Sequence, residues 1–186
     1  MTSDGLRLLL EQVVSLLSTI GIPHMVVGSF AAMIHGEPRT THDIDVVIDP
    51  TAEQLDKLLR ALPTERYYVD PDVARDAYRR RSMFNVIDTQ TGWKLDLILR
   101  KARRFSVEEL SRRIKAKIRG VAVDSASAED TIIAKLEWSK EGNSDRQLED
   151  VAGILRVRGD GLDRDYIERW VEELELREQW ARAQRL

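Results

Sequence analysis

Two aspartates interrupt the stretch Thr41-His42-Asp43-Ile44-Asp45-Val46-Val47-Ile48-Asp49, which is otherwise rich in β-branched apolar residues. Such a composition is typical of a β-strand that is buried or half-buried. Alternate residues of a strand point to the same face, so Asp43 and Asp45 are expected to project together, roughly 6.6 Å apart along the backbone. Two neighbouring carboxylates repel each other, and a buried one is costly without a partner. The stretch therefore predicts a strand whose acidic face holds a cation.

A third aspartate, Asp96, lies in a second apolar stretch, Trp93-Lys94-Leu95-Asp96-Leu97-Ile98-Leu99. If the two strands are neighbours, three carboxylates share one face. Oxygen ligands without cysteine favour Mg²⁺ or Mn²⁺ over zinc. Three carboxylates on adjacent strands are of the kind that holds two such ions ~3.5–4 Å apart. We predict Asp43, Asp45 and Asp96 as metal ligands and catalytic residues, the alternatives being a solvated acidic pair and an Asp96 paired with arginine or lysine.

Upstream, a Gly28-Ser29 pair separates a short apolar stretch, His24–Val27, from a helical pattern over residues 30–36. Glycine at a strand-to-helix turn lets the backbone approach a phosphate, and the start of a helix offers free N–H groups to that phosphate. On its own the pair is also compatible with an ordinary turn.

The combination of strand, Gly-Ser, helix, Arg39-x-Thr41-x-Asp43-x-Asp45 and a later strand aspartate resembles the nucleotidyltransferase superfamily. Within it, the chain is most similar to the minimal nucleotidyltransferases and the abortive-infection toxin-like nucleotidyltransferases of bacteria. The resemblance covers residues 22–100 and, more loosely, the C-terminal helices. It implies an α+β fold: a small mixed sheet flanked by helices as the nucleotidyltransferase core (1–124), and a C-terminal helical segment (125–186) packed on it.

The resemblance also implies an activity, the metal-dependent transfer of a nucleoside monophosphate from an NTP such as ATP to an acceptor hydroxyl. RNA or a protein is the expected acceptor. The expected context is a toxin–antitoxin or phage-defence system, in which the chain is either toxin or antitoxin. The residues expected to bind the nucleotide are Gly28, Ser29, Arg39, Thr41, Lys135 and Asp150. The alternative function is a catalytically inactive nucleotide- or RNA-binding module with the same fold.

The helical residues of this set have a second interpretation. Lys135 is expected to hold phosphate as a point charge. Arg146 and Asp150 are four residues apart, so they are equally compatible with a simple ion pair within one helix. Glu137 and Glu149 lie nearby and have the pattern of ordinary surface residues.

The composition restricts the classes of function. The chain has 186 residues, no cysteine and a net charge of −3. Absence of cysteine excludes disulfides and thiolate chemistry and fits a reducing cytoplasm, and the net charge argues against a generic nucleic-acid binder. Two basic clusters are interpreted as solvated faces or as a platform for triphosphate or RNA: Arg75, Arg79, Arg80, Arg81, and Arg100, Lys101, Arg103, Arg104, Arg112, Arg113, Lys115, Lys117, Arg119.

Periodicity and capping patterns predict the remaining elements. Gly5–Ile20 is expected to be an amphipathic helix rather than a signal peptide or a membrane span, so no membrane partner is expected. Residues 82–88 and 93–99 predict a hairpin. Capping-box patterns predict helix starts at Thr51, Ser106, Ser127 and Ser144, and a last amphipathic helix is expected from Tyr166 to Leu174. The three histidines are interpreted as structural, with His42 pointing away from the aspartate pair.

Overall fold

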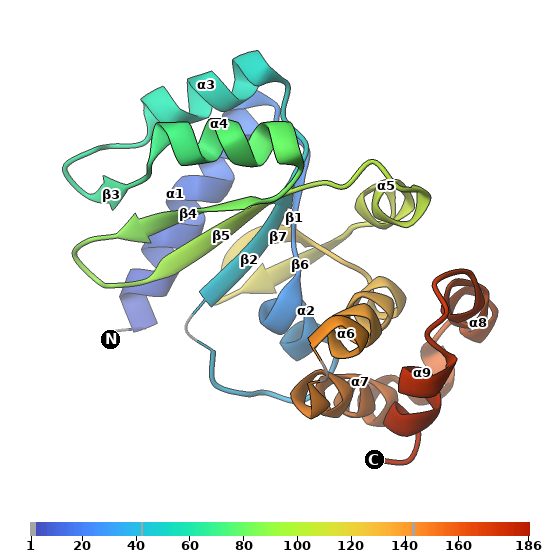
Figure 1. Ribbon diagram of the computed structural model, residues 1–186. Helices are drawn as coiled ribbons and strands as arrows, with labels where there is room; N and C mark the ends of the chain where they lie inside the picture. The colour runs from blue at the N-terminus through green and yellow to red at the C-terminus, as the bar shows by residue number, and fades with distance from the viewer. Residues whose placement is uncertain (1–2, 42, 143) are drawn as a thin grey trace.

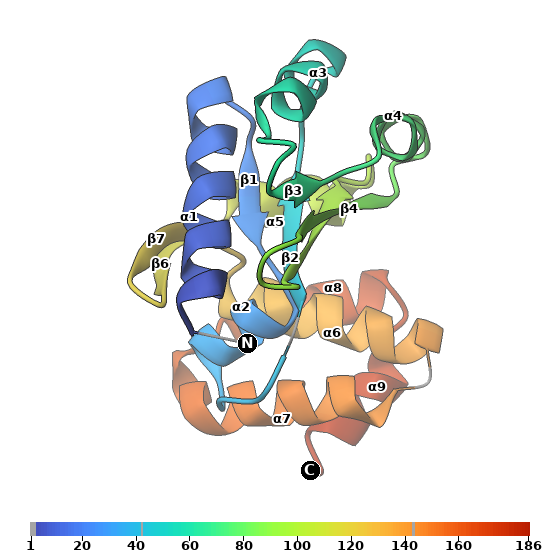
Figure 2. The ribbon, with the colours of Figure 1, turned by 90° about the vertical axis from the view of Figure 1, so that its left-hand side faces the viewer.

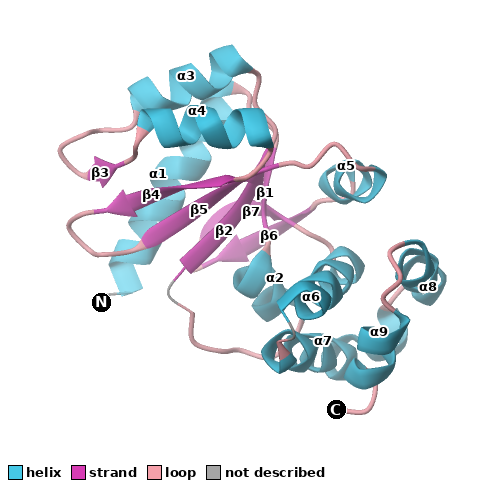
Figure 3. Ribbon diagram, in the orientation of Figure 1, coloured by secondary structure: helices cyan, strands magenta, loops and turns pink. Residues whose placement is uncertain are grey.

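The computed structural model describes residues 3–41, 43–142 and 144–186. Within these ranges the strands are β1 (His24–Val26), β2 (Asp43–Ile48), β3 (Tyr67–Tyr68), β4 (Met83–Asp88), β5 (Lys94–Leu99), β6 (Ile114–Ile118) and β7 (Val121–Ser125). They form one sheet in the order β3-β4-β5-β2-β1-β7-β6 (Figures 1 and 3). The pairs β2–β5 and β1–β7 are parallel and the other neighbours are antiparallel. The sheet is therefore mixed, as predicted.

The described helices are α1 (Ser3–Ile20), α2 (Gly28–His35), α3 (Ala52–Ala61), α4 (Pro71–Arg80), α5 (Arg104–Ser111), α6 (Ala128–Gly142), α7 (Asp145–Arg158), α8 (Arg164–Glu173) and α9 (Arg177–Ala183), with a 3₁₀ turn at Gly159–Gly161. Together with the mixed sheet they give the predicted α+β fold. None of the helices in the described ranges has the length and apolar character needed to cross a membrane.

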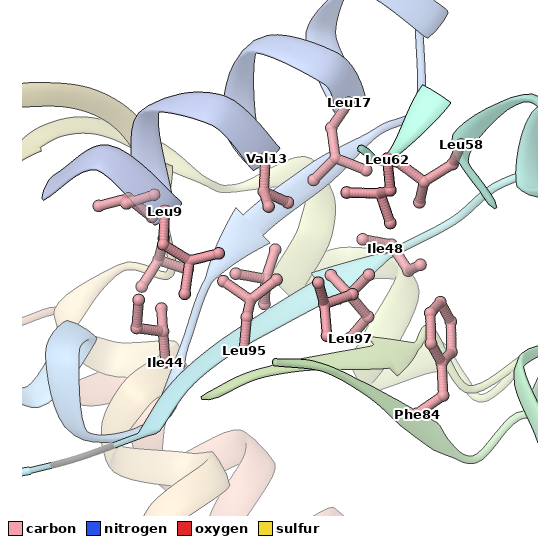
Figure 4. Close-up of a cluster of buried hydrophobic side chains, with 14 of the residues drawn as sticks. Leu9, Val13, Leu17, Ile44, Ile48, Leu58, Leu62, Phe84, Leu95 and Leu97 are labelled. Atoms are coloured by element: carbon pink, nitrogen blue, oxygen red, sulfur yellow. The ribbon is translucent and has the colours of Figure 1, made fainter. Parts of the chain in front are cut away.

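One face of the sheet is covered by α1, α3 and α4 (Figures 1 and 2). Every second residue of β2 and β5 points into this layer and is fully buried, and Figure 4 shows these side chains packed against leucines of α1 and α3: Ile44, Ile48, Leu95 and Leu97 of the strands, and Leu9, Leu17 and Leu58 of the helices. This apolar cluster is the main core, and burial of such surface contributes about 25 cal/mol per Å² to folding.

The other face of the sheet meets α2 and α5, beyond which α6–α9 form a helical layer (Figures 1 and 2). The apolar cluster of that layer includes Trp170, Trp180 and Leu136, together with Ala32 of α2 and Phe105 of α5. The helices after residue 125 thus share their apolar cluster with two residues of the preceding part of the chain. Because the strands alternate, the polar residues of β2 and β5 point to this side.

Three local predictions need correction. The Ser-x-x-Glu pattern at Ser106 does not start a helix, because α5 begins earlier and the Ser106 hydroxyl instead accepts a hydrogen bond from Arg103 Nε at 3.1 Å. The helix after β1 begins at Gly28 rather than after Ser29. Ser144 does precede α7, but its side chain makes no capping hydrogen bond with the described residues.

The other two capping predictions are confirmed. Thr51 and Gln54 form a reciprocal capping box at the start of α3. The Ser127 hydroxyl accepts a hydrogen bond from the backbone N–H of Asp130 at 3.1 Å, at the start of α6. Helix α9 follows α8 without having been expected, and its Trp180 packs into the C-terminal cluster.

Candidate active site

Strand register brings the acidic residues together. In the parallel pair β2–β5, Asp45 lies opposite Asp96, and Asp43 lies opposite Lys94. Asp96 is only 6% exposed, Asp45 is half-buried and Asp43 is exposed. The predicted sharing of one sheet face by the three aspartates is therefore a property of the register as well as of the strand pattern.

A lysine compensates two of these carboxylates. Lys94 Nζ lies 3.2 Å from Asp96 Oδ2 and 3.7 Å from Asp43 Oδ1. The other oxygen of Asp96 accepts a hydrogen bond from Asn85 Nδ2 at 2.5 Å.

Within the described ranges no three acidic or histidine side chains are close enough to share one metal ion. The donor set consists of hard carboxylate oxygens, which suit Mg²⁺ or Mn²⁺, and the ammonium of Lys94 is the positive charge that the structure itself places there.

The environment of Asp45 disfavours the ionised form of its carboxyl group. Burial, and then repulsion from Asp96 and Asp43, raises the pKa of the Asp45 carboxyl, against the opposing effect of Lys135 and Lys94. Burial disfavours the charge of Lys94, but its hydrogen bond to Asp96 and attraction to all three aspartates outweigh it and raise the pKa of the ammonium. A site of this kind gains free energy from any additional cation.

Gly28 is required by close packing against Asp45. Its φ is +61°, and a Cβ atom at this position would lie 2.1 Å from Asp45 Oδ2 and 2.8 Å from Asp45 Cγ. Any other residue would displace the carboxylate and strain the backbone. Because Val27 provides no side-chain cap to α2, the first N–H groups of this helix have no side-chain acceptor at its cap. The turn thus places a helix start directly beside the acidic face.

A group of paired charges lies next to Ser29. Arg39 Nη2 donates a short hydrogen bond to the Ser29 hydroxyl, and Arg39 Nε lies 2.9 Å from Asp150 Oδ1. Lys135 Nζ lies 2.7 Å from Asp150 Oδ2 and donates to Gln147 Oε1 at 2.8 Å. Burial lowers the pKa of Lys135, although its bond to Asp150 opposes the shift. Asp150 therefore holds two cations at the start of α2.

This arrangement bears on one of the two interpretations of Asp150, its pairing with Arg146, whereas its role in nucleotide binding stays a prediction. Its partners are Arg39 and Lys135, not Arg146, whose guanidinium instead donates to the Thr40 carbonyl at 3.4 Å. The prediction of a simple pair within α7 is wrong. Thr41 is less involved, because its hydroxyl contacts only the Asp43 carbonyl, at 3.4 Å, among the described residues. The prediction for His42 lies outside the described residues.

A cavity of about 250 Å³ extends from these groups across the sheet face to α5 and α6. Its lining combines residues of the site, Gly28, Ser29, Asp45 and Lys135, with residues of α5, its N-cap and α6: Arg103, Phe105, Ser106, Glu109, Glu137 and Trp138. Its volume approaches the ~300–1,000 Å³ of typical small-molecule pockets. The cavity joins the predicted phosphate-binding residues to a region that the sequence did not single out.

Two glutamates of this region were misinterpreted from sequence. Glu109 is a buried residue of the cavity wall rather than part of a capping box. Glu137 is not an ordinary surface residue, because it accepts two short hydrogen bonds from Arg103 and also lines the cavity. Both are charged residues, so hydropathy alone gave no signal of burial.

The two basic clusters differ in position. Arg75, Arg79 and Arg80 lie on or at the end of α4, on the face opposite the carboxylates, and pair with Asp56, Asp72 and Asp76. Their interpretation as a solvated face is the one that these ion pairs support. In the second cluster, Arg100, Lys101 and Arg103 line the cavity.

Sequence comparison adds nothing to this geometry, since no protein-family profile matches the chain and no curated protein is significantly similar. Structure comparison is informative. ANT(2″)-Ia in complex with adenylyl-2″-tobramycin is 13% identical, with a TM-score of 0.61 over 92% of this chain and 99% of that one. An antigenic nucleotidyltransferase-like protein from Paracoccidioides brasiliensis is 16% identical, with a TM-score of 0.59 over 98% of this chain and 93% of the other.

A third solved structure, the lincosamide antibiotic adenylyltransferase LnuA bound to lincomycin, is 13% identical, with a TM-score of 0.56 over 84% of this chain and 98% of that one. At such identities the likeness establishes architecture. The resemblance predicted from the motifs is confirmed at this level: the chain has the nucleotidyltransferase fold.

Proposed function

We propose that this protein transfers a nucleoside monophosphate from an NTP to an acceptor hydroxyl. The observation that carries the proposal is the position of Asp45, in register with Asp96 on one side and packed against Gly28 on the other. In the reaction, the acceptor oxygen forms a bond to the α-phosphorus, the bond from phosphorus to the bridging oxygen breaks, and pyrophosphate leaves. Asp96 would accept the hydroxyl proton, because it is the buried carboxylate of the pair.

The triphosphate would lie at the start of α2. Ser29 and the first N–H groups of the helix are hydrogen-bond donors for its β- and γ-phosphates. Arg39 and Lys135 would neutralise the charge that develops on pyrophosphate. Asp150 already holds both cations in place, so little ordering would be needed when the nucleotide binds.

Asp43, Asp45 and Asp96 would hold a divalent cation, Mg²⁺ or Mn²⁺, after their side chains turn toward one another, since no three described carboxylates are close enough to share an ion as they stand. When bound, such an ion supplies charge neutralisation at the phosphates and lowers the pKa of the acceptor hydroxyl. The raised pKa of Asp45 supports this proposal, because it identifies a carboxylate whose charge is only partly compensated by the protein. Lys94 would release Asp43 and Asp96 to the ion.

We further propose RNA or a protein as the acceptor, in a toxin–antitoxin or phage-defence role, on the strength of the motif resemblance. Small-molecule acceptors are the contrasting class, since ANT(2″)-Ia is known in complex with an adenylylated antibiotic. The labelling experiment below separates these classes by the size of the labelled product.

The second candidate function is an inactive nucleotide- or RNA-binding module. The ion pairs of Lys94 with Asp43 and Asp96 favour it, because they neutralise the acidic face without a metal. The two candidates differ in one requirement: only the enzyme needs a divalent cation to bind an NTP productively.

The test is transfer of label from each α-³²P-NTP, with Mg²⁺ and cell lysate or total RNA, to RNA, protein or small molecules. We expect transfer by the native protein and none by Asp45→Asn. The matched control is Asp56→Asn, the same substitution on α3 at an exposed residue paired with Arg75 on the opposite side of the sheet. Absence of label with every NTP, together with Mg²⁺-independent nucleotide binding, would move the conclusion to the inactive module.

A further inference from the structure

The part of the cavity wall formed by α5 contains a carboxyl group that has no hydrogen-bonding partner among the described residues. Glu109 on α5 is 7% exposed and lines the cavity, and it makes no hydrogen bond or ion pair with any described residue. The other buried acidic residues are all partnered: Asp88 by Arg66, Asp96 by Lys94 and Asn85, and Asp130 by Tyr166, Ser127 and Arg112. A carboxyl group of a largely buried residue that lines a cavity and has no partner in the protein is available to hydrogen-bond a ligand in that cavity.

The charges around Glu109 do not satisfy it. Asp130 and Glu137 of α6 repel it and Arg103 attracts it, but the hydrogen bonds of the Arg103 guanidinium go to Glu137 and Ser106. Burial, reinforced by Asp130, raises the pKa of the carboxyl to about 8. At neutral pH the group is therefore an uncharged acid, with one O–H donor and one carbonyl acceptor.

The rest of the wall is suited to a flat ring. Val47, Ile98 and Phe105 are apolar, and the indole of Trp138, which is 58% exposed, provides an aromatic surface at the same cavity. Aromatic side chains stack on bases of every kind, because each base has a π-face. The lining combines apolar walls with few polar groups, as small-molecule sites do.

The covalent bond between the nucleoside and the triphosphate identifies the ligand that this cavity would bind. Under the proposed function the triphosphate lies at Gly28, Ser29 and Lys135, which line the cavity. The nucleoside is joined to that triphosphate, and it is small enough to lie in the cavity beside the largely buried Glu109. An RNA or protein acceptor has no such covalent link to the triphosphate.

We propose that the cavity binds the nucleobase of the NTP and that Glu109 hydrogen-bonds its Watson–Crick edge; this rests on the proposed function. The protonated acid can donate to adenine N1 and accept from the adenine N6 amine. The ionised form has acceptors only, so it opposes the lone pair of adenine N1 but matches the N1 and N2 donors of guanine. The protonation state of Glu109 thereby determines whether adenine or guanine is bound more tightly.

The experiment is calorimetric binding of non-hydrolysable ATP, non-hydrolysable GTP and inorganic triphosphate, each with Mg²⁺. Glu109→Leu should weaken ATP binding about 10-fold, equivalent to ~1.4 kcal/mol, and leave triphosphate binding unchanged. Glu109→Gln, which keeps one donor group and one acceptor, should bind ATP nearly as the native protein does. Glu149→Gln is the matched control, because Glu149 is an exposed glutamate of α7 that is not part of the cavity lining.

A pH comparison gives a second readout. Between about pH 7 and about pH 9 the native protein should lose affinity for ATP relative to GTP, whereas Glu109→Gln should not, because the amide does not titrate. Thermal unfolding of each variant verifies that it is folded.

The outcomes separate the two proposals. Unchanged ATP binding by folded Glu109→Leu, or equal loss of ATP and triphosphate binding, would overturn the nucleobase assignment alone. The same conclusion would follow if the native protein bound ATP no more tightly than triphosphate. A native protein that binds neither ligand would overturn the proposed function and this inference together.

Discussion

Strands β2 and β5 have opposite chemistry on their two faces, although the residues alternate along the same backbone. The face under α1 and α3 carries Ile44, Val46, Leu95 and Leu97, all fully buried in the main core. The other face carries Asp43, Asp45, Lys94 and Asp96. The first face supplies apolar burial, whereas the second gathers three carboxylates whose mutual repulsion opposes folding and is only partly compensated by Lys94.

The difference between the two faces shows how a small sheet tolerates a destabilising site. A net stability of 5–15 kcal/mol is typical of a domain, so an acidic cluster is retained only where apolar burial offsets it. Here the apolar residues whose burial offsets the repulsion are the direct sequence neighbours of the acidic residues and point to the other face of the same strands. Substitutions at adjacent positions should therefore separate activity from stability, and the predictions below test that separation.

The largest effect is expected at Asp96. Asp96→Asn should lower nucleotidyl transfer about 10²- to 10³-fold, the range found when one preorganised transition-state contact is removed. Its free energy of unfolding should fall by about 1 kcal/mol, because the single amide oxygen can accept from Asn85 or from Lys94 but not from both, while the repulsion between Asp96 and Asp45 is removed. Label transfer and urea unfolding measure the two quantities. Retained activity would remove Asp96 from the reaction.

The next residue along the strand should behave in the opposite way. Leu97→Ala removes a fully buried side chain from the main core (Figure 4) and should lower the free energy of unfolding by ~2–5 kcal/mol. Activity per folded molecule should be preserved at a temperature where the variant is folded. Val107→Ala, on an exposed apolar residue of α5, is the control and should cost about 0.5 kcal/mol or less. Loss of activity in folded Leu97→Ala would show that the two faces are coupled.

The alternation on which this comparison depends could be predicted from sequence, because a strand has a period of two. The β2 and β5 strands, the three aspartates and the Gly28-Ser29 turn were all identified in this way. Lys94 was not, since its position opposite Asp43 follows from the β2–β5 register, and the two strands are separated by β3, β4 and two helices along the chain.

The cavity residues were missed for a related reason. The Ser106-to-Glu109 spacing matches a capping box, and a local pattern carries no information on which side chains the distant α6 will bury. Asp150 likewise pairs with residues of other segments. Arg39 is 111 residues away from it along the chain, and Lys135 lies on the preceding helix. Sequence predicted the residues that define the sheet face, but not the helical residues that close over it.

A smaller effect is expected when the internal counter-ion of the acidic face is removed. Under the proposed function, Lys94→Met should tighten Mn²⁺ binding about 10-fold, because an ammonium near two carboxylates competes with the ion by roughly 1–4 kcal/mol of Coulomb energy. Titration followed by the electron paramagnetic resonance of free Mn²⁺ gives the dissociation constant directly. Lys57→Met, at an exposed lysine of α3 paired with Glu53, should leave it unchanged. Equal affinities of native protein and Lys94→Met would contradict competition by Lys94.

The smallest effect concerns how the helical layer is attached on the acidic side. His35, at the end of α2, is buried, with Nε2 2.8 Å from the Ala126 carbonyl and Nδ1 2.9 Å from Arg158 Nη2. These contacts fit the neutral ring, with Nε2–H donating and Nδ1 accepting. Burial, and to a lesser degree Arg158, lowers the pKa of His35 against the opposing effect of Ala126.

Because the folded pKa of His35 is below its ordinary value of 6.5, the unfolded chain binds the proton more readily. This contribution to stability is therefore present above pH 6.5 and is lost as the pH falls through the lowered pKa. Relative to His35→Gln, whose amide does not titrate, the native protein should lose on the order of 1 kcal/mol of unfolding free energy between about pH 7.5 and about pH 5. Urea unfolding at both pH values measures the difference, and all other titrating groups cancel between the two proteins. If the two pH dependences coincide, the ring does not titrate differently in the folded state, and the attachment of α2 to α7 is insensitive to the charge on His35.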